Sequence, residues 1–193
     1  MTWLLIILVL VVAFGPVLWL VPSKRDKRLS ALRSRARSAG LIVEMRRIPK
    51  PDPTPEERVS AGGKVRSPAL ECASYGLPLR RALKNLPTWR VVRKAAQEGP
   101  DPFAEWQYDQ RPKGEGRAHL DQVLPLAEAL LEAMPADMAA VEVSSRMLLA
   151  YWLEKPGTTE DAVPDLAAAL GAFADSLSDL DEEIEAARTT DDS

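Results

Sequence analysis

Residues 2–21, TWLLIILVLVVAFGPVLWLV, limit the fold of this chain more than any other segment, because none of these twenty side chains is charged. A helix rises about 1.5 Å per residue, so a helix over this segment is about 30 Å long, the thickness of the hydrocarbon core of a bilayer. A helix also satisfies its own backbone hydrogen bonds, as a spanning segment must. The sequence therefore predicts one transmembrane helix over residues 1–22, with the rest of the chain outside the bilayer.

Four residues of this segment are predicted to anchor or shape the span. Trp3 and Trp19 lie near its two ends, where indole rings favour the membrane interface. Gly15 and Pro16 lie inside it, and proline removes a backbone hydrogen bond and bends a helix. The bend is open to two interpretations: a hinge or packing notch, or a tolerated kink in a lone anchor.

The basic residues near this segment all follow it, which predicts its direction. No Lys or Arg precedes the run, and the run is longer than the apolar part of a cleaved signal peptide, so we expect an uncleaved anchor. The positive-inside rule then predicts an outside N-terminus and a cytoplasmic body, at the inner membrane if the chain is bacterial.

Residues 23–40 are predicted to form a basic juxtamembrane helix, begun by Ser23 with Asp26 and stopped by Gly40. Its basic side chains are Lys24, Arg25, Lys27, Arg28, Arg33, Arg35 and Arg37. These charges either fix topology alone or also contact anionic lipid headgroups, each contributing about 1 kcal/mol. Nucleic acid is not an expected partner, because no aromatic residues interleave with the basic ones.

The body, residues 41–187, is predicted to be one α+β domain with a small mixed or antiparallel sheet and helices on one face. Alternating apolar residues between Pro and Gly predict strands over 41–48, 70–75, 89–94, 104–109 and 139–143. Residues 49–68 are predicted to be a mobile Pro-rich loop, residues 79–86 a helical turn, and residues 111–116 a chain break.

Three later helices are predicted from apolar residues at helical spacing. The first is capped by Asp121, carries Pro125 in its first turn and ends before Pro135. The second is capped by Ser144 or Ser145, runs to Lys155 and is apolar nearly all round, so it should be deeply buried. The third, 159–187, starts at a Thr158–Asp161 capping box with Pro164 in its first turn, and residues 188–193 are expected to be disordered.

The third helix carries a regular apolar seam with alternating steps of three and four residues. Its members are Val163, Leu166, Leu170, Phe173, Leu177, Leu180 and Ile184. Such a seam is typical of a helix offered to a partner or to its own copy. We favour the alternative, an amphipathic helix packed on its own domain, because such apolar stripes are common in globular domains.

The sequence contains no motif of catalysis, metal binding or cofactor binding. His119 is the only histidine and Cys72 the only cysteine, and neither lies in a nucleophile or metal-ligand pattern. We therefore predict no catalytic, cofactor or metal site. His119 is interpreted as a polar boundary residue and Cys72 as a small buried apolar one.

Two functions remain as hypotheses. The first is a single-pass membrane-anchored accessory or scaffold protein, which would hold a partner or its own copy through the span or the 159–187 helix. In arrangement, a short span followed by basic residues, the chain resembles accessory subunits of membrane machines such as the YajC-type subunit of the bacterial preprotein translocase. The second is a membrane-tethered enzyme whose site would draw on His119, Glu105, Asp109 and Glu142.

Overall fold

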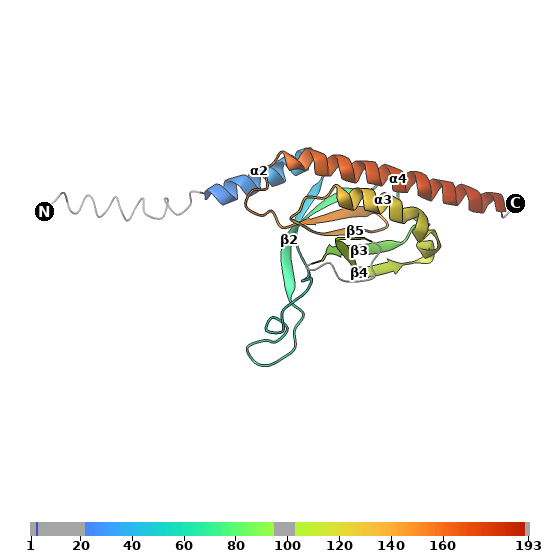
Figure 1. Cartoon of the computed structure of the whole chain (residues 1–193). Helices are drawn as coiled ribbons and strands as arrows, with labels where there is room; N and C mark the ends of the chain where they lie inside the picture. The colour runs from blue at the N-terminus through green and yellow to red at the C-terminus, as the bar shows by residue number, and fades with distance from the viewer. Residues whose placement is uncertain (1–2, 4–21, 95–102, 192–193) are drawn as a thin grey trace.

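The computed structural model describes residues 3, 22–94 and 103–191 of the chain (Figure 1). The elements, in chain order, are α2 (Lys24–Ser38), β1 (Ile42–Pro49), β2 (Ala69–Pro78), β3 (Thr88–Arg93), β4 (Trp106–Lys113), the short 3₁₀ helix η1 (Glu115–His119), α3 (Leu120–Glu132), β5 (Met138–Val143), β6 (Met147–Trp152) and α4 (Ala162–Asp191). The predicted α+β class is confirmed.

The strands form one antiparallel sheet in the order β1-β2-β6-β5-β3-β4. The two strands that come last in the sequence, β5 and β6, therefore occupy its centre. Alternate residues of β6 face opposite sides: Leu148, Ala150 and Trp152 join the main core, whereas Leu149 and Tyr151 join a smaller cluster on the other face. Both faces of this central strand are thus buried.

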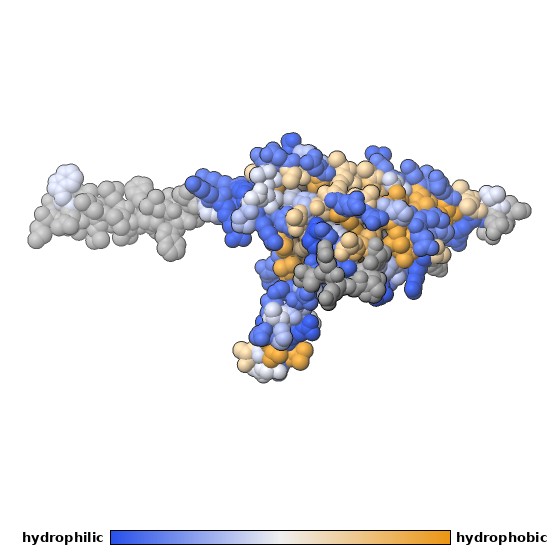
Figure 2. Space-filling view, in the orientation of Figure 1, coloured by the Kyte–Doolittle hydropathy of each residue, from blue (hydrophilic) through white to orange (hydrophobic). Residues whose placement is uncertain are grey.

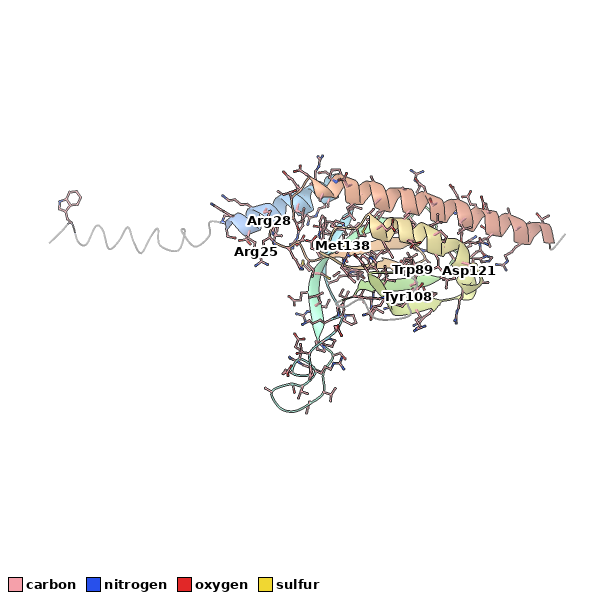
Figure 3. All side chains as sticks on the ribbon, viewed as in Figure 1. Arg25, Arg28, Trp89, Tyr108, Asp121 and Met138 are labelled. Carbon is pink, nitrogen blue, oxygen red and sulfur yellow. The ribbon has the colours of Figure 1, made fainter. Side chains whose placement is uncertain are left out.

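Helices α2, α3 and α4 cover one face of the sheet, with α4 running along the length of the domain (Figure 1). The core lies between these helices and the sheet, where Tyr75 and Trp152 meet edge to face with ring centroids 5.3 Å apart. Trp89 and Met138 lie in this region of the sheet, whereas Arg25 and Arg28 lie at the beginning of α2 (Figure 3). Helix α2 is part of this core, because Leu32 and Ala36 are fully buried in it.

Residues 50–68 connect β1 to β2 and project from the sheet, away from α4 (Figure 1). An isolated bridge between Val59 and Val65 closes this projection, which we call the arm. Lys50 and Glu57 form an ion pair at its base, 2.5 Å between Nζ and Oε1. Both valines are exposed, Val65 by 88%, and Figure 2 shows apolar residues at the end of the arm.

The prediction of a helix from Ser144 or Ser145 to Lys155 is wrong, because this segment contains strand β6. The Ser144 hydroxyl accepts from the Met147 N–H at 3.2 Å and so closes the turn between β5 and β6 instead of capping a helix. The predicted deep burial of the segment is correct.

The predicted helical turn at 79–86 is also wrong. Its backbone N–H groups bind distant acceptors: Leu83 donates to the Ser145 carbonyl at 2.7 Å, and Lys84 and Asn85 donate to the Asp181 carboxylate at 3.0 and 2.7 Å. A helix would have used these donors within the segment.

Several element boundaries differ from the prediction. Strand β4 continues to Lys113, so the chain breaks only at Gly114, which has a φ of 98°. Helix α3 follows η1 and begins at Leu120 with no side-chain cap, so Asp121 lies in its first turn and Pro125 inside it. Helix α4 runs from Ala162 to Asp191, with Pro164 in its first turn as predicted. The prediction of a disordered tail over 188–193 is therefore wrong for residues 188–191, which continue the helix.

Among the described residues, no helix combines the length and the apolar character that crossing a bilayer requires. The span predicted over 1–22 lies outside the described residues apart from Trp3 and Pro22; Trp3 is helical and 77% exposed.

Candidate functional site

The junction between the N-terminal run and the domain is the candidate functional region, and helix α2 forms it. The Ser23 side chain accepts from the Asp26 N–H at 3.2 Å, and the Asp26 carboxylate accepts from the Ser23 N–H at 3.1 Å, which is the predicted capping box with Asp in place of Glu. Gly40 follows the helix with a φ of 85°, as predicted for its stop. Only Pro22 and Ser23 therefore separate helix α2 from the uncharged run 2–21.

Two arginines of α2 bind the loop that follows β6. Arg28 donates to three backbone carbonyls of this loop: Glu154 at 3.0 Å, Lys155 at 2.9 Å and Thr158 at 2.7 Å. Arg33 donates through Nε and Nη2 to the two carboxylate oxygens of Glu154, at 2.9 and 2.5 Å. These arginines therefore hold the helix to the domain.

Glu154 is the centre of this contact, which we call the α2 clamp (Arg28, Arg33, Tyr75 and Glu154). It is one of four buried polar residues among those described, and its backbone adopts a left-handed φ of 51°. The Tyr75 hydroxyl also donates to its carboxylate at 2.7 Å. Burial and this hydrogen bond raise the pKa of Tyr75, and the hydrogen bond to Glu154 raises the pKa of Arg33.

Asp137, which precedes β5, holds the same loop from the other side. Its carboxylate accepts from Trp152 Nε1 at 2.7 Å, from the Thr158 hydroxyl at 2.6 Å and from the Lys155 N–H at 3.0 Å. Burial alone would raise the pKa of Asp137, but these hydrogen bonds outweigh it and lower the pKa. The Thr158 hydroxyl is engaged here and not in the predicted capping box.

The other basic residues of α2 remain exposed. Lys24, Arg25, Lys27, Arg35 and Arg37 all face solvent, whereas Arg28 and Arg33 are half-buried. These five exposed side chains are the basic groups of α2 that are accessible to lipid headgroups or that can set the orientation of the predicted span. Arg28 and Arg33 bind protein groups within the domain.

The apolar seam of α4 packs on the domain itself. Val163, Leu166, Leu170, Phe173, Leu177 and Ile184 are buried in the main core, and Leu180 packs against it. This arrangement matches the interpretation of the seam as an amphipathic helix packed on its own domain. A partner at the seam would have to displace the core.

The candidate catalytic groups do not meet at one place. Asp109 and Glu142 both bind Arg90 on the face of the sheet without helices, at 2.7 and 3.3 Å, and Tyr151 donates to Glu142 at 2.7 Å. Burial and the hydrogen bond to Glu142 raise the pKa of Tyr151 to about 12. His119, in contrast, lies at the beginning of α3. The network on the sheet consists of mutually satisfied ion pairs.

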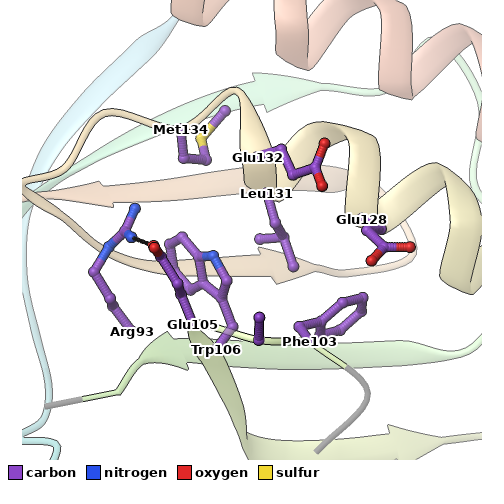
Figure 4. A pocket seen from close by; sticks show the side chains of 9 residues that line it. Arg93, Phe103, Glu105, Trp106, Glu128, Leu131, Glu132 and Met134 are labelled. Carbon is purple, nitrogen blue, oxygen red and sulfur yellow. Dashed lines mark hydrogen bonds and ion pairs between the residues drawn. The ribbon is translucent and has the colours of Figure 1, made fainter. Parts of the chain in front are cut away.

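Glu105 lies in a separate pocket of about 270 Å³ between β4 and α3 (Figure 4). The floor is apolar and includes Phe103, Trp106 and Leu131. Glu105 forms an ion pair with Arg93, whose guanidinium lies 4.4 Å from the centre of the Trp106 ring. The residues that the structure places in this lining include no serine, cysteine or histidine.

Cys72 is buried on the sheet, as predicted, and burial raises the pKa of its thiol to about 11. A thiol in this environment is a poor nucleophile. In the part of the chain that the structure describes, His, Cys, Asp and Glu side chains form no group of three that could hold a metal ion.

Comparison of the chain with protein-family models, curated proteins and solved structures finds no match. Sequence reasoning missed the α2 clamp. Its one local signal is Glu154, a lone carboxylate at the end of an apolar run and just before Pro156-Gly157.

Proposed function

We propose that this chain is a single-pass membrane-anchored accessory or scaffold protein, with its α+β domain at the cytoplasmic face. One observation carries the proposal: α2, which only two residues separate from the uncharged run, is fixed to the domain by the α2 clamp and by buried Leu32 and Ala36. A flexible tether needs no such contacts. A helix locked to the domain transmits the position of the anchor to the whole body.

The charge pattern also supports the proposal. Lys24, Arg25 and Lys27 are exposed at the beginning of α2, beside the end of the run. Basic residues this close to a span set its direction and are attracted to anionic headgroups. The alternative, a membrane-tethered enzyme, has less support because His119, Glu105 and the Asp109–Glu142 pair lie at three separate places in the domain.

Membrane attachment is tested by extracting membranes of a bacterial expression host with alkaline carbonate. We expect the chain to stay in the membrane pellet, and its release into the supernatant would contradict the anchor.

Orientation is tested with a Val65→Cys variant, because Val65 is 88% exposed on the arm and the native Cys72 is buried. A membrane-impermeant maleimide should label the introduced cysteine only after the cells are lysed. Labelling of intact spheroplasts would place the body outside. The parent chain, treated with the maleimide in parallel, controls for labelling of Cys72.

The scaffold role is tested by affinity purification in mild detergent after cross-linking in cells. Stoichiometric recovery of another protein supports the role. Recovery of the chain alone and monomeric would contradict it.

A further inference from the structure

The outer edge of β1 is a free strand edge with exposed apolar side chains. Among the described residues, no strand pairs with this edge, because β1 ends the sheet and pairs only with β2. The register with β2 is regular over all of β1, and Ile42 and Met45 are 44% and 60% exposed. A regular edge of this kind is ready to pair with another strand.

The opposite edge of the sheet is protected against pairing. Strand β4 contains Pro112, which lacks an N–H, and its register with β3 shifts twice. Proline and bulges are the usual means of blocking an edge strand. Strand β1 also contains a proline, but Pro49 is its last residue and its register with β2 has no shift, so its edge is regular from Ile42 to Ile48.

The hydrogen bonds of β1 show which backbone groups point outward. The Lys50 N–H donates to the Pro68 carbonyl, and the carbonyls of Glu44 and Arg46 accept from Ser74 and Cys72 side chains of β2. In an antiparallel pair the bonded residues alternate, so the even-numbered residues of β1 face β2. The N–H and C=O groups of Val43, Met45 and Arg47 therefore point away from the sheet.

We propose that a second copy of this chain pairs with β1 along this edge, antiparallel, with Met45 opposite Met45 of the second copy. Val43 of each copy then lies opposite Arg47 of the other. Together with the Met45 pair, this gives three residue pairs that each exchange two backbone hydrogen bonds. Ile42 lies opposite Ile48, and the sheets of the two copies become continuous.

Charge complementarity selects this register and identifies the occupant as a second copy. With Met45 at the two-fold axis, Glu44 of each copy lies opposite Arg46 of the other. If the axis passes through residue 44 instead, Glu44 lies opposite Glu44 of the other copy. If it passes through residue 46, Arg46 lies opposite Arg46. Opposite charges across strands stabilise the pairing and like charges weaken it. Within one copy Glu44 and Arg46 form an exposed ion pair, 2.9 Å between Oε2 and Nη2, and their side-chain exposures of 54% and 42% leave both charges accessible to the second copy.

Disulfide cross-linking of the full-length chain in native membranes tests the register. Opposed bonded residues have Cα atoms about 5.5 Å apart, within disulfide range, so Met45→Cys should form a covalent dimer on oxidation. Arg47→Cys is the matched control: it lies on the same exposed strand, but the two copies of residue 47 are about 13 Å apart in this register. Cys72 is 2% exposed and should not contribute.

Charge reversal tests the specificity in a way that also controls for folding. Glu44→Arg and Arg46→Glu, each purified alone in detergent, place like charges opposite each other and should weaken dimerisation about tenfold or more. In a mixed dimer of the two variants, the introduced arginine faces the introduced glutamate, and the native Arg46 of one copy faces the native Glu44 of the other. Mixing should therefore restore the dimer. Light scattering coupled to size exclusion measures both results.

Three results would overturn the proposal. The first is no cross-link at Met45→Cys, as expected if a different protein occupies the edge. The second is equal cross-linking at Arg47→Cys. The third is a dimer that survives both single reversals unchanged, which would place self-association elsewhere, such as in the span. None of these results depends on the membrane orientation of the domain.

Discussion

Removing the negative charge at the centre of the α2 clamp should release α2 from the domain. Glu154→Gln keeps the shape of the side chain but replaces the carboxylate that accepts from Arg33 Nε, Arg33 Nη2 and the Tyr75 hydroxyl. The amide nitrogen of glutamine is a donor, so it faces donors that it cannot satisfy.

The size of the effect follows from burial. The Glu154 side chain is 5% exposed and that of Arg33 is 26% exposed. Breaking a fully buried ion pair costs about 3–5 kcal/mol. Because Arg33 keeps some access to water, we expect about 2–3 kcal/mol, a value in line with hydrogen bonds to charged groups.

Hydrogen exchange of the full-length chain in detergent, read by mass spectrometry, measures this loss where it occurs. A local opening that becomes about 2–3 kcal/mol easier raises the exchange rate of α2 amides about 30- to 150-fold. The amides of α4 should change less, because the α4 seam remains packed on the sheet.

Arg47→Ala is the control, because its ion pair with Glu71 has the same 2.5 Å length but both side chains are more than 60% exposed. Exposed pairs contribute about 0.5 kcal/mol or less, so α2 exchange should not change measurably. Equal exchange of α2 in Glu154→Gln and Arg47→Ala would refute the role of the clamp. An equal rise in α2 and α4 would show that Glu154 supports the whole domain and not this joint.

Three further predictions concern Asp181, Cys72 and Asp137. Asp181→Ala leaves the N–H groups of Lys84 and Asn85 unpaired, at about 3 kcal/mol, so Tm should fall by about 6–12 °C in a circular-dichroism melt. Cys72, with a thiol pKa of about 11, should react with iodoacetamide at neutral pH about a hundredfold more slowly in the folded chain than in urea. Asp137 has a lowered pKa in the folded state, so its contribution to stability is complete above the unfolded pKa and is lost as pH falls through the folded value. Asp137→Asn should therefore flatten the decline of Tm below about pH 4, and an unchanged pH profile would contradict this.

Local patterns predicted the elements whose signals lie within a few residues. Ser23, Asp26 and Gly40 mark the ends of α2 in both sequence and structure, because capping is a contact between near neighbours. Alternation located β1, β2, β3 and β5 to within a few residues. The seam of α4 was predictable for the same reason.

The errors arise where distant groups decide the structure. The apolar run MLLAYW of β6 has no period that separates a buried strand from a buried helix. Its place in the sheet depends on β5, which directly precedes it, and on β2, which lies far earlier in the sequence. The segment 79–86 is held by Asp181, about a hundred residues later. Glu154 and Arg33 are likewise joined only by the fold.

The two proposals together constrain how the domain would face the membrane. Pairing along β1 with a two-fold axis normal to the sheet leaves the helices of both copies on one face of the continuous sheet. Both α2 helices then lie on that face, each separated from its uncharged run by only two residues. Because two anchors that enter one bilayer must reach it from the same side, the helix-covered face would be turned to the membrane. The arm, which projects away from α4, would then point away from the bilayer, and Val59 and Val65 would be the first apolar groups that a partner meets (Figures 1 and 2).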